Sequence, residues 1–235
     1  MSELPAPFPA QTVQLVGGGT MPQFGFGTYK VPDDQAEDVV SDALALGYRH
    51  IDTAAMYGNE RGVGRALAAS GLARDDLFVT TKLNNPDHEP QAAREGFARS
   101  LDLLGLDHVD LYLIHWPLAA STDYVATWRT MLEFTQDGRA RAVGVSNFQP
   151  NHLQAIIEAT GVVPAVNQIE VHPGFSQAEQ RADNRERGIV TQAWSPTDTP
   201  TDSSTTDTTT TDPSSSSSSS TSDDPGTSIL DNRNK

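Results

Sequence analysis

Several short apolar runs in the sequence end in side chains that can take part in acid catalysis. Asp52, Lys82 and His115 each end or follow such a run, and Tyr57 comes five residues after Asp52. A tyrosine is mostly protonated at neutral pH, and a nearby lysine ammonium favours the phenolate and lowers the pKa of the phenol. We therefore expect Asp52 to hold Lys82, and Lys82 to lower the pKa of Tyr57. The set predicts proton donation by Tyr57 to a developing alkoxide, with His115 orienting the carbonyl oxygen or helping to deliver the proton.

Reduction of a carbonyl also needs a hydride, and no side chain supplies one, so the chemistry predicts a redox cofactor. Ser146, Asn147 and Gln168 follow or lie in later apolar runs and suit the carboxamide of a nicotinamide. Trp194 offers a flat surface on which such a ring can stack. The strand-end residues Gly27–Tyr29 are further candidates.

Each of these residues taken alone has a more ordinary interpretation. Asp52 has near even odds of being a turn or helix cap, and Ser146 with Asn147 could cap the helix that starts near residue 150. Tyr57 and Trp194 alone fit packing, and His115 alone fits a structural role. The combination of these residues favours a reaction site. Lys82 adds weight because the chain contains only three lysines and this one follows an apolar run.

An alternation of strand and helix patterns predicts how these residues are positioned. Strand-like runs start 24 to 32 residues apart, which is the length of a β/α unit. They cover residues 24–29, 48–53, 77–83, 109–115, 140–146, 165–172 and 189–194. Helical patterns lie between them at residues 35–46, 60–70, 90–104, 123–135, 150–159 and 177–187, and residues 12–22 read as a hairpin.

Seven such units favour an α/β fold of the (β/α)8 TIM-barrel type over an open doubly wound sheet. The runs are continuously apolar, as in parallel strands that are buried on both faces. An open sheet would need a glycine-rich phosphate loop after its first strand, and the Gly25-Phe-Gly27 segment lacks that pattern. In a barrel, the candidate residues meet at the carboxyl ends of the strands.

The chain divides by composition into residues 1–196 and residues 197–235. The second part contains 11 Ser, 11 Thr and 7 Asp, and its aliphatic residues are Ile229 and Leu230. We expect residues 1–196 to form an incomplete barrel and residues 197–235 to be a disordered tail without a strand. The first and seventh barrel strands would then be open edges.

Composition and charge exclude several other classes of protein. The absence of cysteine excludes disulfides, thiolate metal sites and a cysteine nucleophile. The net charge of −15 argues against nucleic-acid binding. The sequence shows neither a signal peptide nor an apolar run long enough to span a membrane, and we expect a monomeric cytoplasmic protein without a bound metal.

The motifs around the candidate residues resemble those of the aldo-keto reductase family over residues 12–196. The matching segments are residues 21–28, 47–60, 81–83, 110–117, 144–148 and 167–173. The resemblance implies an NADPH-linked (β/α)8 barrel that reduces carbonyl compounds, and the chain looks most like the bacterial branch that reduces diketogulonate and methylglyoxal.

The resemblance also implies a role for each candidate residue. Asp52, Tyr57, Lys82 and His115 would form the catalytic tetrad, with Tyr57 as the general acid. Ser146, Asn147 and Gln168 would bind the nicotinamide amide, and Trp194 would stack on the ring. Gly27, Thr28 and Tyr29 would complete the cofactor site, and Trp116 would line the substrate pocket.

The sequence departs from the family pattern at three places. Asn84 stands where an aromatic residue is usual, which would widen or repolarise the substrate mouth. The helical segment 177–187 is short of large apolar residues, so its hold on the barrel would be weak. After Pro196 the family's seventh helix, eighth strand, eighth helix and phosphate-binding Lys-Ser and Arg cluster are replaced by the Ser/Thr/Asp-rich segment.

Three origins for that segment are open: a frameshift or gene-model artefact, which we favour, a genuine low-complexity stalk, or a barrel completed by another chain. The sequence thus predicts an NADPH-dependent reductase of small aldehydes, ketones or keto-sugars. The alternative is a truncated, catalytically impaired reductase-like protein that is inert or binds a partner.

Overall fold

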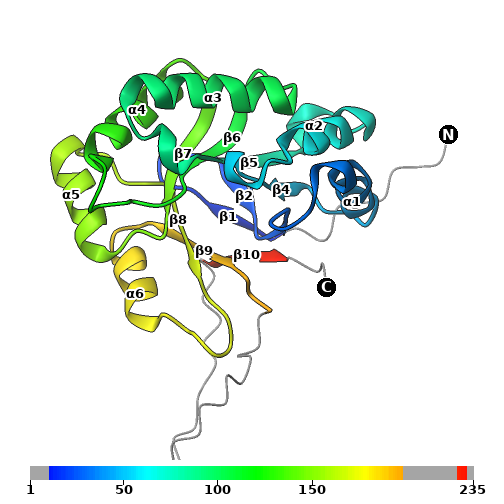
Figure 1. Ribbon diagram of the computed structural model, residues 1–235. Helices are drawn as coiled ribbons and strands as arrows, with labels where there is room; N and C mark the ends of the chain where they lie inside the picture. Colours follow the sequence, from blue (N-terminus) through cyan, green and yellow to red (C-terminus); the bar gives the residue numbers. More distant parts are fainter. Residues whose placement is uncertain (1–10, 198–226, 232–235) are drawn as a thin grey trace, which may run out of the picture.

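The strands of the chain form a closed parallel barrel. The computed structural model describes residues 11–197 and 227–231. The order of strands around the barrel is β10-β3-β4-β5-β6-β7-β8-β9 (Figure 1). Their bounds are β3 Phe24–Gly27, β4 His50–Asp52, β5 Phe78–Leu83, β6 Val109–Ile114, β7 Ala140–Ser146, β8 Val166–Glu170, β9 Val190–Trp194 and β10 Thr227–Asp231. The expected α/β barrel class and the seven expected strands are confirmed.

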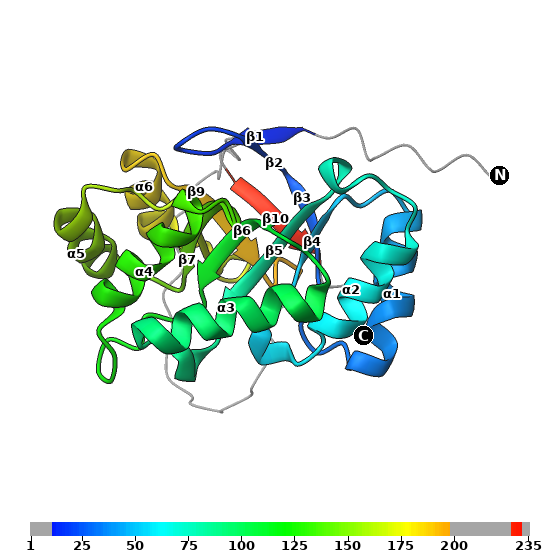
Figure 2. The same ribbon diagram turned by 90° about the horizontal axis from the view of Figure 1, so that it is seen from above.

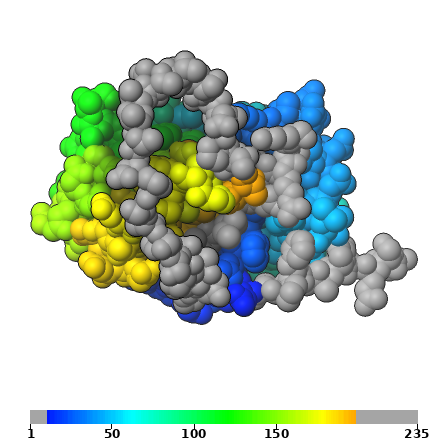
Figure 3. Space-filling view, turned by 90° about the horizontal axis from the view of Figure 1, so that it is seen from below, coloured from blue at the N-terminus to red at the C-terminus, as the bar shows by residue number. Residues whose placement is uncertain are grey.

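Helices pack on the outside of this barrel. They are α1 Asp33–Ala45, α2 Glu60–Ala69, α3 Pro90–Leu104, α4 Tyr124–Gln136, α5 Pro150–Thr160 and α6 Ala178–Glu186, with short 3-10 turns η1 Ala55–Tyr57, η2 Arg74–Asp76 and η3 Asn85–Asp87. Sequence signals explain their ends: α3 begins at Pro90 behind the capping side chain of Glu89 and ends at Gly105 with φ 66°. Figure 3 shows α1 and α2, in blue, on the opposite side of the molecule from the later, green to yellow helices.

The hairpin of β1 (Thr12–Gln14) and β2 (Thr20–Pro22) covers the end of the barrel where the strands begin (Figure 2). Val13, Leu15 and Met21 of this hairpin are buried and pack against Phe78 and Leu111 inside the barrel. This apolar plug closes one end of the barrel. The carboxyl ends of the strands are thereby left as the end where a ligand can enter.

Strand β10 corrects the expectation that residues 197–235 contain no strand. It pairs in parallel with both β9 and β3, with Ile229 opposite Ala193 and Phe24. The edges that we expected to be open are therefore paired. This segment contains no continuous apolar run. A short strand flanked on both sides is held by backbone hydrogen bonds and needs only β-compatible residues such as Thr and Ile. Residues 198–226 and 232–235, on which the rest of the expected disorder falls, lie outside the described residues.

Helix α6 is attached to the barrel by polar contacts. Its buried residues are Gln180 and Asn184, in keeping with the expected shortage of large apolar side chains. The Asn184 side chain accepts a hydrogen bond from Asn167 and donates one to Thr191, both on barrel strands. By contrast, α3 and α4 pack through aromatic rings, with Phe97 stacked on the β6 residue Tyr112 at 4.0 Å between ring centroids. The hold of α6 depends on directional hydrogen bonds.

Candidate active site

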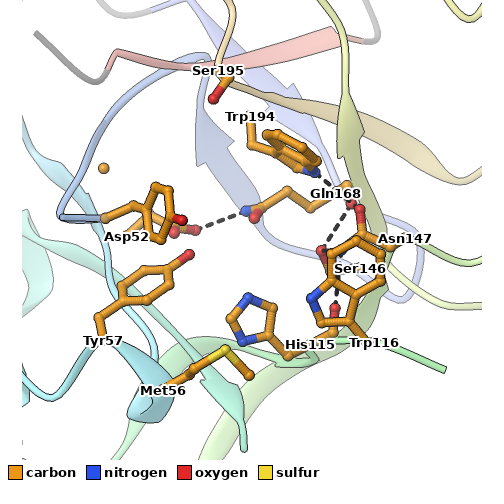
Figure 4. Close-up of a pocket in the computed structure, with 12 residues that line it drawn as sticks. Asp52, Met56, Tyr57, His115, Trp116, Ser146, Asn147, Gln168, Trp194 and Ser195 are labelled. Atoms are coloured by element: carbon orange, nitrogen blue, oxygen red, sulfur yellow. Dashed lines mark hydrogen bonds between the residues drawn. The ribbon is translucent and has the colours of Figure 1, made fainter. Parts of the chain in front are cut away.

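A cavity of about 190 Å³ opens at the carboxyl ends of the strands (Figure 4). Its walls combine aromatic rings with side chains that can exchange protons or form amide hydrogen bonds. The lining residues are Gly27, Tyr29, Asp52, Met56, Tyr57, His115, Trp116, Ser146, Asn147, Gln168, Trp194 and Ser195. Most of the candidates predicted from strand ends thus meet in one cavity.

Lys82 forms a buried ion pair with Asp52, which lines the cavity, while Lys82 itself lies beneath the cavity surface. The Lys82 side chain is 0% exposed and that of Asp52 is 2% exposed. The Lys82 ammonium also donates to the Thr53 carbonyl at 3.0 Å and lies 3.4 Å from the Tyr57 hydroxyl. Burial alone lowers the pKa of Lys82, but the charge of Asp52 and the contact with Tyr57 outweigh it and the pKa is raised. Lys82 is therefore a fixed positive charge beneath Tyr57.

Tyr57 lies on η1 and turns its hydroxyl toward the cavity (Figure 4). Burial raises the pKa of this phenol, and the charge of Lys82 opposes that rise without overcoming it. The expectation that Lys82 lowers the pKa below its ordinary value is therefore wrong, because it did not include desolvation. The consequence favours proton donation, since the phenol is fully protonated at neutral pH.

His115 follows β6 and faces the same space as the Tyr57 hydroxyl (Figure 4). The centroids of the two rings are 5.6 Å apart, with the rings nearly perpendicular. Burial, reinforced by the positive charge of Lys82, lowers the pKa of His115 to about 3. The imidazole is therefore neutral at physiological pH and can orient a polar group without adding charge.

Three side chains on the opposite wall form a connected row that ends on the backbone of β8. The Trp194 indole donates to the Asn147 side-chain oxygen at 3.0 Å, and the Asn147 amide donates to the Ser146 hydroxyl at 3.0 Å. The Ser146 hydroxyl donates to the backbone carbonyl of Gln168 at 2.9 Å. Asn147 has a φ of 63°, in the left-handed region. Such backbone strain is more common at functional sites than elsewhere.

Gln168 connects this row to the ion pair. Its side-chain nitrogen donates to Asp52 Oδ2 at 2.8 Å and to Gln192 Oε1 at 2.9 Å. Among the described residues, no donor reaches the side-chain oxygen of Gln168. This oxygen is available to accept a hydrogen bond from an amide N–H of a bound group.

The remaining candidates take different positions. Gly27, Tyr29 and Trp116 line the cavity, and the Tyr29 ring is 5.2 Å from the Tyr57 ring between centroids. Thr28, expected in the cofactor site, is fully buried behind the wall and bonds to Asn59. Lys82 is likewise beneath the surface. Thr28 is therefore not part of the cavity lining.

Asn84 does not line the cavity, although the sequence suggested that it reshapes the substrate mouth. Its side-chain oxygen accepts from the backbone N–H of Asn85 and caps η3. This explains why a small polar residue stands at that position.

Sequence reasoning did not identify Met56 and Ser195 as lining residues. It also missed Gln192 as a buried hydrogen-bond partner of Gln168 and Asn59 as a buried partner of Thr28. Met56 could have been found because it precedes Tyr57 on the same turn. Ser195 faces the cavity because its φ is 50°, and a backbone angle of that kind has no sequence signal at serine. The roles of Gln192 and Asn59 depend on contacts between residues distant in sequence.

Comparison with known proteins identifies the family. The family model "Aldo/keto reductase family" matches residues 16–227. The chain belongs to the aldo/keto reductase family. An aldo-keto reductase of Mycobacterium sp. (strain JLS) is 49% identical over 187 residues, which are 80% of this chain and 68% of the relative. The chain thus aligns with about two thirds of that relative's length.

Solved structures of aldo-keto reductases have the same fold. A reductase from Brucella melitensis superposes with a TM-score of 0.78 at 47% identity, covering 80% of this chain and 73% of that one. A Bombyx mori aldo-keto reductase, solved in complex with NADP, has a TM-score of 0.74 at 38% identity, covering 79% and 66%. The family membership makes this chain an oxidoreductase by fold.

The described residues offer neither a cluster of metal ligands nor a membrane-spanning helix. In residues 11–197 and 227–231 no group of three or more His, Asp or Glu side chains could hold a metal ion. Within the same ranges, no helix has the length and apolar character needed to cross a bilayer.

Proposed function

We propose that the protein is an NADPH-dependent reductase that converts a small aldehyde or ketone to an alcohol. The observation that carries this proposal is the convergence of a protonated Tyr57 hydroxyl, a buried Lys82 ammonium and a neutral His115 on one cavity. Relatives of the same fold support the cofactor assignment, since structures were solved with NADP for the Bombyx mori protein and with NADPH for a mutant of Gox0644.

The wall opposite Tyr57 fits a nicotinamide. The free side-chain oxygen of Gln168 can accept from the carboxamide N–H, and Ser146 and Asn147 stand beside it. Trp194 is fixed through its indole N–H, so its ring face is held in one orientation for stacking. The cofactor, when bound, supplies the hydride.

In this proposal the residues of the chain supply the proton that the carbonyl oxygen takes up and stabilise the phenolate that remains. Tyr57 donates its phenolic proton to the carbonyl oxygen as that oxygen gains negative charge, and solvent later returns the proton. Lys82 stabilises the phenolate left behind, because its ammonium is 3.4 Å from the hydroxyl oxygen and is shielded from water. Asp52 keeps Lys82 charged and in place, and neutral His115 orients the carbonyl oxygen.

The size and lining of the cavity support a small substrate. About 190 Å³ bounded by Tyr29, Trp116 and Trp194 suits a small carbonyl compound or keto-sugar rather than a bulky one. Because the chain resembles the bacterial branch that reduces diketogulonate and methylglyoxal, these two compounds are the first substrates to test.

The composition of the cavity lining favours the second candidate, an impaired reductase-like protein. None of the lining residues in the described part of the chain is a lysine or arginine. Arg233 and Lys235, the cations of the final segment, lie outside the described residues. We therefore expect an NADPH dissociation constant well above the micromolar range.

Titration of NADPH fluorescence and NADPH oxidation with methylglyoxal test the proposal in the full chain. Tyr57→Phe removes the proton donor alone, so kcat should fall by about 10²- to 10⁴-fold with NADPH binding unchanged within twofold. Turnover equal to that of the wild type in Tyr57→Phe would refute the role of Tyr57. Binding without carbonyl-dependent oxidation in the wild type would favour the inert alternative, and micromolar affinity with normal turnover would refute weak phosphate binding.

A further inference from the structure

Asn59 occupies the N-cap position of α2 but does not cap it. Asparagine is favoured at this position because its side-chain oxygen can accept from a free N–H of the first helical turn. Here the side chain makes no capping bond. Asn59 is 0% exposed, so its amide must be satisfied inside the protein.

The Asn59 amide instead bonds to the ends of the two preceding strands. Its nitrogen donates to the carbonyl oxygens of Thr28 at 2.9 Å and Val31 at 2.8 Å. Its oxygen accepts from the Thr53 hydroxyl at 2.8 Å and, at 3.4 Å, from the Thr28 hydroxyl. One fully buried side chain thus connects the segment after β3 with the segment after β4.

The first of these segments carries Tyr29 on the cavity wall. Residues 28–31 form a tight turn in which the Val31 N–H donates to the Thr28 carbonyl at 3.1 Å. Lys30, in the middle of the turn, has a left-handed φ of 64°. Asn59 holds both ends of this strained turn, and so it fixes the place of the exposed Tyr29 ring against Tyr57.

The second segment holds the ammonium of Lys82. The Thr53 carbonyl accepts from Lys82 at 3.0 Å, and the hydroxyl of the same threonine donates to Asn59. The position of this carbonyl therefore depends partly on Asn59. The side-chain amide of Asn59 thus contacts both the turn that carries Tyr29 and the threonine whose carbonyl accepts a hydrogen bond from Lys82.

We propose that Asn59 is a positioning residue that sets the Tyr29 wall and the Thr53 acceptor of Lys82. It contacts neither the cavity nor the Tyr57 hydroxyl, so it acts through these neighbours. Its effect on catalysis rests on the proposed reductase function, whereas its hold on the turn at residues 28–31 does not.

A spin label can test the hold on the turn without any measurement of activity. The chain contains no cysteine, so Tyr29→Cys creates one labelling site at a residue that is 49% exposed. We expect the electron paramagnetic resonance spectrum of the label to show greater mobility when Asn59→Ala is added. Asn59→Asp keeps an oxygen that can accept from Thr53 but loses the N–H donor to Thr28 and Val31. It should therefore increase the mobility of the label to a similar extent, and it replaces Asn59→Ala in the experiment if that variant does not fold.

Asp110→Asn is the matched control. Asp110 is also a buried polar residue with several hydrogen bonds, to Val79 N, Arg74 and Arg141, but it lies near the start of β6 at the opposite end of the barrel. This variant should lower stability and leave the label spectrum unchanged. The proposal would be overturned if Asp110→Asn mobilised the label as much as Asn59→Ala and Asn59→Asp do. It would also be overturned if neither Asn59 variant changed the label spectrum.

Kinetics on the chain with Tyr29 intact test the effect on catalysis. Displacement of a positioned group by about 1 Å can cost on the order of 100-fold in rate, so Asn59→Ala should lower kcat/KM about 10- to 100-fold. Combined with Tyr29→Ala it should cost less than the two separate losses predict, because both changes disturb one wall. A kcat/KM of Asn59→Ala within twofold of the wild-type value would refute the positioning role. A wild-type protein without turnover would refute the proposed reductase function but would leave the result of the label experiment valid.

Discussion

Replacing Lys82 with methionine would remove the positive charge from a buried ion pair and leave the carboxylate of Asp52 behind. The two side chains are 0% and 2% exposed, so water cannot replace the lost ammonium. Gln168 still donates to the second oxygen of Asp52, at 2.8 Å, but it carries no charge. The variant therefore isolates the cost of an unpaired buried carboxylate.

The expected loss is large relative to the whole free energy of unfolding. Removing one partner of a buried ion pair costs about 3–5 kcal/mol, because the remaining charge keeps its desolvation penalty without its attraction. Folded domains are stable by roughly 5–15 kcal/mol in total. Replacing both partners with neutral groups of similar size removes the penalty, so the double variant Asp52→Asn with Lys82→Met should recover most of the loss.

Urea unfolding at pH 7, followed by tryptophan fluorescence and circular dichroism, measures both variants against the wild type. Lys82→Met should unfold at a much lower urea concentration or fail to fold, and the double variant should return close to the wild-type midpoint. Neither variant should reduce methylglyoxal. A loss below about 1 kcal/mol in Lys82→Met, or a double variant as unstable as the single one, would contradict the description of a dry ion pair.

Four further changes test other parts of the molecule. Burial lowers the pKa of His50 to about 4, so as the pH falls this histidine takes up a proton in the unfolded chain before it does so in the folded protein. The free energy of unfolding should therefore fall by about 1 kcal/mol per pH unit below pH 6.5. His50→Gln should flatten that slope in thermal melts at pH 5 to 7. Burial raises the pKa of Glu60, so its ionisation destabilises the fold as pH rises above 4.5, and Glu60→Gln should remove this loss in melts at pH 5 to 8. A Cβ at Gly144 would lie 2.6 Å from the Val166 carbonyl oxygen, so Gly144→Ala should cost roughly 1–3 kcal/mol in urea unfolding, and wild-type stability would contradict that close approach. Deleting residues 227–235 should expose two strand edges and cause aggregation visible by light scattering, whereas a stable monomer would show that β10 is dispensable.

Much of the fold and site could be predicted because parallel β/α units impose their order on the chain. Continuous apolar runs located β3 to β9, and the polar residues at their ends, such as Asp52 and His115, had to meet at one end of the barrel. The structure places these residues and Tyr57 around one cavity.

The parts that could not be predicted depend on three-dimensional surroundings. The direction of the Tyr57 pKa shift results from burial competing with the charge of Lys82, and sequence order does not show which is larger. The inward turn of Ser195 depends on its backbone angle. The role of Asn59 was concealed because its position suggests an ordinary helix cap. Strand β10 was missed because its pairing partners, rather than an apolar pattern, hold it in place.

The barrel closes only when β10 pairs with β3 and β9, so its completion depends on the order in which the strands are synthesised. Phe24 of β3 pairs with Ile229 of β10, so the last seam of the barrel joins residues about two hundred positions apart. During translation, β3 is made early and β10 follows every other described strand, so the outer edge of β3 stays unpaired for most of that time and the facing edge of β9 stays unpaired until β10 is made. Such distant pairing is slow to form, and unpaired edges favour association between nascent chains. The interval between the synthesis of β9 and β10 is therefore when a ribosome-bound copy is most open to wrong partners.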